Sequence, residues 1–212
     1  MLTLMSLVTT TDRGWIAIMH YLHAMLRYSP LSPFIAMMAY AMLQKTSSRK
    51  EFRPMLETLR RIVQDVSAAP DLSSALTITV NRIRDAMQVA ACTAYLADAD
   101  NQGFVLMATA GLNPQAVGRV RLGRQQGLVG LVAERQEPIN LEDAPRHPRY
   151  YPIREVYEEE FHAFLGVPLI QYRRVLGVLL VQHTTIRQFH PAEVDFLVTI
   201  AAQLASILNH AV

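Results

Sequence analysis

The polar stretch of residues 142–162 contains the side chains whose chemistry is best suited to binding a small molecule. Arginine is planar and binds a carboxylate through two parallel hydrogen bonds, so this stretch predicts recognition of a carboxylate-bearing metabolite. A loop of about 20 residues in a compact domain is more often a lid or a binding loop than filler. The candidate ligand-binding residues are Arg146, His147, Arg149, Tyr150, Tyr151 and Arg154.

The same stretch permits other readings of its chemistry. A ligand that carries an ammonium group would need an acceptor, which Glu142, Asp143 or Asp98 could supply. The alternative interpretation is a solvated loop with one or two aromatic side chains fixed to the core. His147 has no companion at the spacing of a metal site, so we predict neither a metal nor a cofactor.

Cys92 is the single cysteine of the chain and lies among Ala91, Thr93 and Ala94. Catalytic thiols need an exposed, electropositive environment that lowers their pKa, so we expect a buried structural role for Cys92 instead. One cysteine excludes an internal disulfide and fits a reducing compartment. We therefore expect a cytoplasmic protein.

The elements that must position these residues are organised around two apolar runs, 164–170 and 175–181, which flank a polar turn. Their length and composition predict a β-hairpin at the centre of a sheet. Because both runs are apolar throughout, the sheet must be covered on both faces. Gly166 and Gly177 indicate either a bulge or a close approach by another group, and Pro168 indicates a bulge or a strand end.

The remaining pattern predicts alternating helices and short strands. Asp71 is a typical helix N-cap, and Pro191 with Glu193 indicates a second helix start. The expected helices are residues 55–66, 72–87, 127–135 and 191–209, and the expected strands are 90–96, 104–110, 118–122 and 138–141.

The first and last helices carry apolar stripes that predict a second function. If they pack together, their remaining apolar surface could meet a copy of itself and build a four-helix dimer interface. The candidate interface residues are Leu56, Leu59, Val63, Val66, Leu197, Leu204 and Leu208.

Residues 1–54 form an apolar and basic extension with a net charge of +4, whereas the whole chain carries +2. Residues 55–212 therefore carry −2, which argues against a nucleic-acid partner. The two apolar runs of the extension are shorter than the roughly 20 residues of a membrane span. We favour an extension outside the fold, translated only if the start lies upstream of Met55, over interfacial membrane contact or packing against the domain.

This order of elements resembles a GAF domain. The runs that carry the resemblance are GLVGLVAERQEPIN (127–140), FLGVPLI (164–170), RVLGVLLVQ (174–182) and FLVTIAAQLASIL (196–208). Together with ETLRRIVQDVSAAPDLSSAL (57–76) and LMATAGLNPQAVGRVRL (106–122), they look like the N-terminal GAF domain of the nitrogen-branch Enzyme I phosphotransferases. The resemblance covers residues 55–212.

The resemblance implies an α+β fold, with an antiparallel sheet between helical layers, and a regulatory role. In that family the GAF domain precedes a phosphoenolpyruvate–protein phosphotransferase and is thought to report nitrogen status, with glutamine and 2-oxoglutarate as proposed signals. The family's phosphohistidine and phosphoenolpyruvate-binding domains have no counterpart in these 212 residues, so we expect that this chain alone is not the enzyme. The alternative is a ligand-free module for dimerisation and signal transmission.

Two other GAF activities are disfavoured by the residues present. The cyclic-nucleotide signature NKxxFxxxDE is matched only at Phe189 and Glu193, and Thr185, Ile186 and Val194 replace its other members. Methionine sulfoxide reduction needs several cysteines, and this chain has one.

Overall fold

The computed structural model describes residues 60–61, 64–65, 68–153, 156 and 161–210, without the side chains of the last two. The chain divides into two units, residues 1–54 and 55–212, and all described residues belong to the second. The expectations for residues 1–54 and for Leu56, Leu59, Val63, Val66 and Arg154 lie outside the described residues.

The described residues form an antiparallel sheet of six strands in the order β3-β2-β1-β6-β5-β4. The expected hairpin is β5 and β6, and β6 pairs with β1 in the middle of the sheet. The strands are β1 Ala91–Ala97, β2 Gly103–Ala110, β3 Arg121–Gly123, β4 Ile139–Leu141, β5 Ala163–Gln171 and β6 Arg174–His183. The helices are α3 Leu72–Met87, α4 Gly127–Arg135 and α5 Pro191–His210, with 3-10 turns η1 Pro114–Ala116 and η2 Ala144–Arg146.

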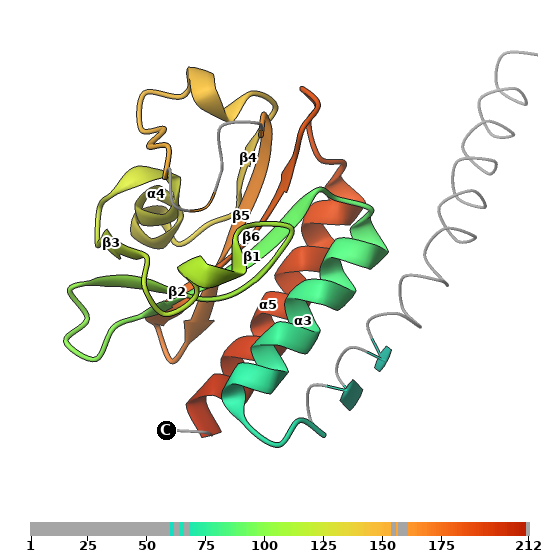
Figure 1. Cartoon of the computed structure of the whole chain (residues 1–212), viewed down its shortest axis with the longest axis vertical. Helices are drawn as coiled ribbons and strands as arrows, with labels where there is room; N and C mark the ends of the chain where they lie inside the picture. Colours follow the sequence, from blue (N-terminus) through green and yellow to red (C-terminus); the bar gives the residue numbers. More distant parts are fainter. Residues whose placement is uncertain (1–59, 62–63, 66–67, 154–155, 157–160, 211–212) are drawn as a thin grey trace, which may run out of the picture. The chain divides into compact units, whose positions relative to one another are not determined.

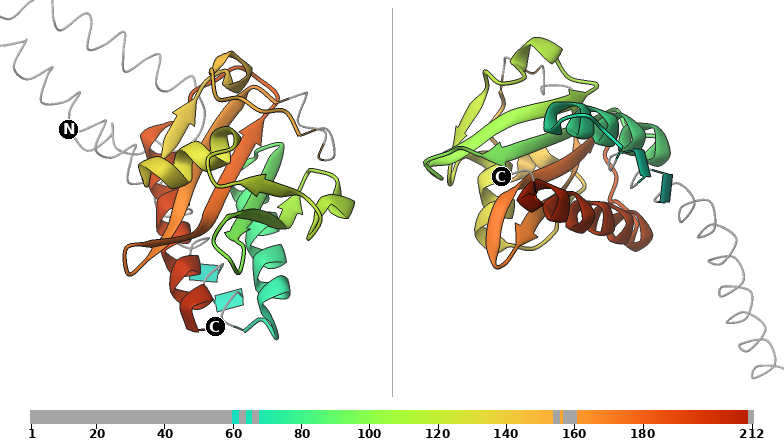
Figure 2. Two further views of the ribbon diagram at one scale, coloured as in Figure 1. Left: turned by 90° about the vertical axis from the view of Figure 1, so that its left-hand side faces the viewer. Right: turned by 90° about the horizontal axis from the view of Figure 1, so that it is seen from below.

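Helices cover both faces of this sheet, as the apolar hairpin requires. In Figures 1 and 2, α3 and α5 lie side by side against one face, and α4 lies against the other. Alternate residues of β6 serve the two cores: Leu179 and Val181 join the cluster under α3 and α5, and Val178 and Leu180 join the cluster under α4. The predicted α+β fold, with its sheet between helical layers, is confirmed.

The two glycines of the hairpin are sites of close approach, as predicted. A Cβ atom at Gly177 would clash with the backbone oxygen of Tyr95 in β1. A Cβ atom at Gly166 would lie 2.7 Å from Cγ2 of Val132 in α4. Pro168 pairs in register with Val178, and the pairing of β5 with β6 shifts register further along, between Leu169 and Ile170, so the irregularity lies near Pro168 and not at it.

The predicted helix starts are also confirmed. Asp71 accepts a hydrogen bond from the backbone N–H of Ser74 at 2.7 Å and caps α3. Glu193 accepts one from the N–H of His190 at 2.8 Å, the return contact that closes the first turn of α5. α5 is long and apolar enough to cross a membrane by composition, but it packs on β5 with Leu197 and Ile200 buried.

Three further expectations concern the start of β3, the burial of Cys92 and the dimer interface. The strand expected at 118–122 begins at Arg121, because Gly118 adopts a left-handed conformation with φ of 74° and turns the chain first. Cys92 is fully buried, as predicted, and burial raises the pKa of its thiol. Leu197, Leu204 and Leu208 pack in the core of the domain, so the predicted dimer interface would have to use other side chains of α5.

Candidate ligand-binding site

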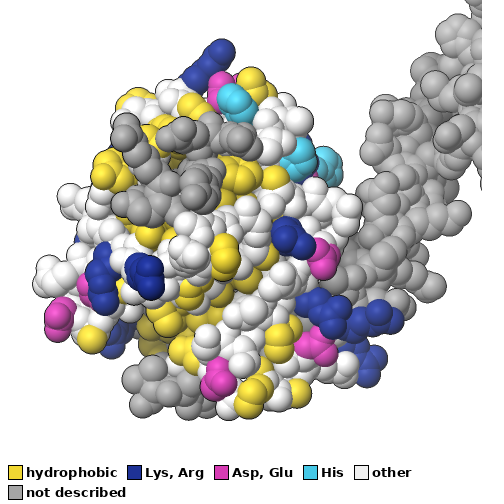
Figure 3. Space-filling model, viewed as in Figure 1, with side chains coloured by type: hydrophobic (Ala, Val, Ile, Leu, Met, Phe, Trp, Pro, Cys, Tyr) yellow, Lys and Arg dark blue, Asp and Glu magenta, His cyan; other side chains and the backbone are white. Residues whose placement is uncertain are grey.

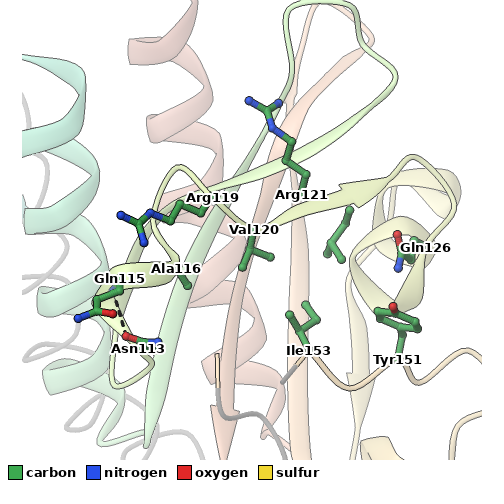
Figure 4. Close-up of a pocket in the computed structure, with 10 residues that line it drawn as sticks. Asn113, Gln115, Ala116, Arg119, Val120, Arg121, Gln126, Tyr151 and Ile153 are labelled. Carbon is green, nitrogen blue, oxygen red and sulfur yellow. Dashed lines mark hydrogen bonds between the residues drawn. The ribbon is translucent and has the colours of Figure 1, made fainter. Parts of the chain in front are cut away.

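A cavity of about 600 Å³ lies on the α4 face of the domain, between η1, β3 and residues 151–153 of the loop. Its floor is apolar: Ala116, Val120, Leu122 and Ile153 are each less than a tenth exposed. Figure 4 shows Val120 and Ile153 in the middle, with Gln115 and Arg119 on one side and Gln126 and Tyr151 on the other. Ligand cavities of this size, with an apolar floor and a few polar groups, are typical of small-molecule sites.

The polar groups of this cavity differ in what they have left to offer a ligand. Asn113 accepts a hydrogen bond from the N–H of Gln115, and Gln126 accepts one from the N–H of Gly123 through its Oε1. Arg119 and Arg121 are exposed, and neither guanidinium has a carboxylate partner among the described residues. An anionic ligand would therefore meet these two arginines first.

A second, smaller cavity of about 20 Å³ lies deeper, between the start of α4 and the sheet. Leu122, Tyr151 and Ile153 line both cavities. The inner cavity adds Gly127, Leu128 and Val129 from α4 and Gln182 from β6. This volume has room for about one water molecule, so in this conformation the inner cavity admits only a small chemical group.

The structure describes five of the six predicted ligand-binding residues, all but Arg154, and it places these five in different surroundings. Tyr150 and Tyr151 line the inner cavity, and Tyr151 also lines the outer one. Arg149 is occupied elsewhere, because its guanidinium pairs with Glu134 at 2.7 Å and donates to the carbonyl oxygen of Gln125. His147 accepts a hydrogen bond from the backbone N–H of Arg149.

Arg146 lines neither of these two cavities. Its side chain is 84% exposed, and its Nε is 2.8 Å from Asp143. The same carboxylate lies 2.8 Å from Nδ1 of His162, which fixes the two ends of the 142–162 stretch to each other. Ligand binding by the predicted set stays a prediction, and the geometry adds Arg119, Arg121 and Gln182 to it.

The start of the loop is also bound to the start of α5. Asn140 in β4 pairs with the backbone of Phe189, and the N–H of Arg187 donates to the carbonyl oxygen of Glu142. Arg187 in turn forms two hydrogen bonds with Glu193 in the first turn of α5 and lies 4.3 Å from the centre of the Phe189 ring. Phe189 and Glu193, the two residues that match the cyclic-nucleotide signature, therefore help to hold the start of the loop against the start of α5. This junction of loop and helix explains their presence.

Charged side chains are mixed on the described surface. On the face that Figure 3 shows, the charged side chains form several small groups, and most of these groups contain both basic and acidic side chains. Among the described residues, Arg82 forms an ion pair with Asp65, and Arg149 forms one with Glu134. The exclusion of nucleic acid stays a prediction from the net charge.

The six-stranded antiparallel sheet, with two helices on one face and a short helix over a cavity on the other, defines a GAF domain. The GAF domain family matches residues 71–208, and the chain belongs to this family.

Three relatives that are 45–49% identical to this chain are named as phosphotransferase proteins or as domains of them. A curated protein of Escherichia coli (strain K12), named "Phosphoenolpyruvate-dependent phosphotransferase system", is 49% identical over 155 residues, which is 73% of this chain and 21% of that protein. The chain thus spans about a fifth of the length of that relative. The GAF domain from a phosphoenolpyruvate-protein phosphotransferase of Coxiella burnetii is 46% identical, with a TM-score of 0.71 over 74% of this chain and 94% of that one. The corresponding Acinetobacter domain is 45% identical, with a TM-score of 0.68 and the same coverage.

Proposed function

We propose that residues 55–212 are the small-molecule-sensing regulatory domain of a phosphoenolpyruvate–protein phosphotransferase of the nitrogen branch, located in the cytoplasm. The observation that carries the proposal is the cavity of about 600 Å³, which has an apolar floor and two arginines without a carboxylate partner among the described residues. The relatives named as phosphotransferases, at 45–49% identity, support the kind of protein that the domain regulates. The catalytic steps would belong to phosphotransferase domains beyond these residues.

The proposed signals are glutamine and 2-oxoglutarate, which share a five-carbon skeleton with a carboxylate. Arg119 or Arg121 would bind one end of that skeleton, because a guanidinium donates hydrogen bonds to a carboxylate or to an amide oxygen. The methylene groups would lie over Val120 and Ile153, where they lose contact with water.

The proposed mechanism is a shift between two arrangements of the loop and α5. A ligand that binds one arrangement more tightly than the other raises its population. Tyr151 places the loop in the cavity, and the Asn140–Phe189 pair connects the root of that loop to α5. α5 packs on β5 and its entry is bound to the root of the loop, so its position is the quantity that an attached domain would read.

Thermal unfolding of the 212-residue chain with glutamine or 2-oxoglutarate tests the proposal. A ligand present at 100 times its dissociation constant adds about 2.7 kcal/mol, which raises Tm by roughly 5–10 °C for a domain of this size. The double variant Arg119→Ala, Arg121→Ala should lose most of the shift. The control Arg146→Ala removes an arginine whose side chain is 84% exposed and should keep it.

Two results would contradict this proposal. If neither compound raises Tm at millimolar concentration, the domain is not a sensor for them. If Arg146→Ala loses the shift and the double variant keeps it, the ligand binds at the solvated part of the loop instead.

A second candidate function, dimerisation without a ligand, is favoured by the outer surface of α5. Val194, Val198 and Ala202 follow each other at spacings of four, with Val194 half-buried at the edge of the core and Val198 and Ala202 exposed, so they form one apolar stripe along the helix. A homodimer that packs these stripes together should become monomeric on Val198→Glu, as measured by sedimentation. A parent chain that is monomeric at all concentrations would exclude this function.

A further inference from the structure

Gln182 is a polar side chain in an otherwise apolar strand. It is 4% exposed, and its Oε1 is buried without a hydrogen-bond donor among the described residues. Residues two apart in a strand share a face, so Gln182 lies with Leu180 and Val178 on the side that α4 covers. A buried acceptor without a donor is destabilising, so the site is incomplete as the described residues leave it.

The first turn of α4 faces the same inner cavity. The N–H groups of Gly127, Leu128 and Val129 precede the first intrahelical bond, which the N–H of Gly130 makes with Gln126. No side chain caps this helix, because the Gln126 amide accepts from Gly123 instead. Three such N–H groups at the positive end of a helix form a binding site for an anion.

We infer that the inner cavity binds the head group of an α-amino acid. The carboxylate accepts hydrogen bonds from the first N–H groups of α4, and the ammonium donates one to Oε1 of Gln182. This inference rests on the proposed sensing function and narrows its ligand. A 2-keto acid such as 2-oxoglutarate has no N–H group, so it leaves Gln182 without a donor.

The remainder of the ligand extends into the outer cavity. Tyr151, Leu122 and Ile153 line both cavities, so a ligand with its head group inside passes these three side chains. Tyr151 is 50% exposed, whereas Leu122 and Ile153 are buried, so an outward movement of Tyr151 disturbs the core least. Binding therefore displaces Tyr151 and the loop that carries it, and the ligand side chain reaches Arg119 and Arg121.

Three five-carbon dicarboxylic acids that differ only at the α-carbon test the inference on the parent chain. L-glutamate carries an ammonium there, 2-oxoglutarate a keto group and glutarate two hydrogens. We expect L-glutamate and L-glutamine to raise Tm, and 2-oxoglutarate and glutarate to bind at least tenfold more weakly. Equal binding of all three diacids would overturn the inference, and this comparison does not depend on any variant.

The variant Gln182→Met separates a ligand contact from a structural role. Methionine has a similar volume and removes the unpaired acceptor, so the variant without ligand should be at least as stable as the parent. With L-glutamate it should show at least a tenfold higher dissociation constant. The control Gln203→Met replaces an exposed glutamine of α5 and should change neither quantity.

The outcomes distinguish this inference from the proposed function. If 2-oxoglutarate binds as tightly as L-glutamate and Gln182→Met binds both like the parent, the sensing function stands and the inference fails. If no compound raises Tm, both fail. A large loss of stability in Gln182→Met without ligand would show that Gln182 supports the fold and would also overturn the inference.

Discussion

The side-chain amide of Asn140 binds the backbone of Phe189 through both its nitrogen and its oxygen. Nδ2 of Asn140 donates to the carbonyl oxygen of Phe189 at 2.8 Å, and Oδ1 accepts from the N–H of Phe189 at 3.2 Å. The two residues are 49 positions apart, at the root of the 142–162 stretch and at the entry to α5. This pair is the direct connection between the loop that reaches the cavity and the helix that would carry a signal.

Asn140→Ala should lower the free energy of unfolding by about 1–3 kcal/mol, because it leaves two backbone groups of Phe189 without their partners. Urea unfolding measures the change. Asn81→Ala is the matched control, since the amide of Asn81 makes one exposed hydrogen bond within α3, and it should change stability by less than about 0.5 kcal/mol. Equal effects of the two variants would mean that the pair contributes nothing specific.

Glu193→Gln should lower the free energy of unfolding by about 1–2 kcal/mol. The carboxylate accepts two hydrogen bonds from Arg187 and one from the N–H of His190, and charge-assisted bonds are the stronger kind. Glu137→Gln is the control, because its pair with Arg135 is exposed and its N–O distance is 3.7 Å, and it should cost less than about 0.5 kcal/mol. A loss no larger than that of the control would contradict the role given to this junction.

Gly177→Ala should lower the free energy of unfolding by about 2–3 kcal/mol, because the added methyl meets the backbone oxygen of Tyr95 and the central strands cannot separate to admit it. Gly123→Ala in β3 is the control, since its nearest neighbour would be 3.6 Å away. Chemical unfolding should show a near-parental midpoint for the control. A parental midpoint for Gly177→Ala would show that the sheet is less rigid here than its contacts indicate.

The stability that depends on Cys92 should vary with pH in the alkaline range only. Burial raises the pKa of this thiol above its unfolded value, so the folded state binds the proton more tightly. The contribution is fully present below the usual thiol pKa near 8.5 and is lost as the pH rises further, by up to about 1.4 kcal/mol per pH unit. The measurement is the difference in free energy of unfolding between the parent and Cys92→Ala from pH 7 to pH 10. A difference that stays constant would place the thiol in contact with water.

The sequence predicted the elements whose signals are local. α4 has the bounds expected from its apolar run, and α3 begins directly after its Asp71 cap. The hairpin was predicted from two apolar runs, and Gly177 indicated a bulge or a close approach, which the structure shows to be the approach of β1. Short-range patterns suffice for such features, because each depends on neighbours in the chain or on the absence of a side chain.

The candidate site was predicted only in part, because it depends on which side chains are already paired. The sequence does not distinguish Arg149 from Arg119 as ligand-binding residues. In the structure Arg149 forms an ion pair with Glu134, whereas Arg119 forms none with a described carboxylate. The alternation of Arg119, Val120, Arg121 and Leu122 was a signal for an apolar floor with a charged rim. Gln182 at the end of an apolar strand was another, since a polar residue in phase with Leu180 faces the core.

The pairing of β1 with β6 constrains how the domain is made. Ala91 pairs with Gln182, so the middle of the sheet stays open until the ribosome has delivered some 90 further residues. Until then the β1–β2 pair has one unpaired edge of strongly apolar character, the kind of surface on which nascent chains associate. The β5–β6 hairpin is local and forms quickly once it emerges, and its arrival covers that edge. Translation speed through residues 98–173 therefore sets how long this growing chain is exposed to aggregation.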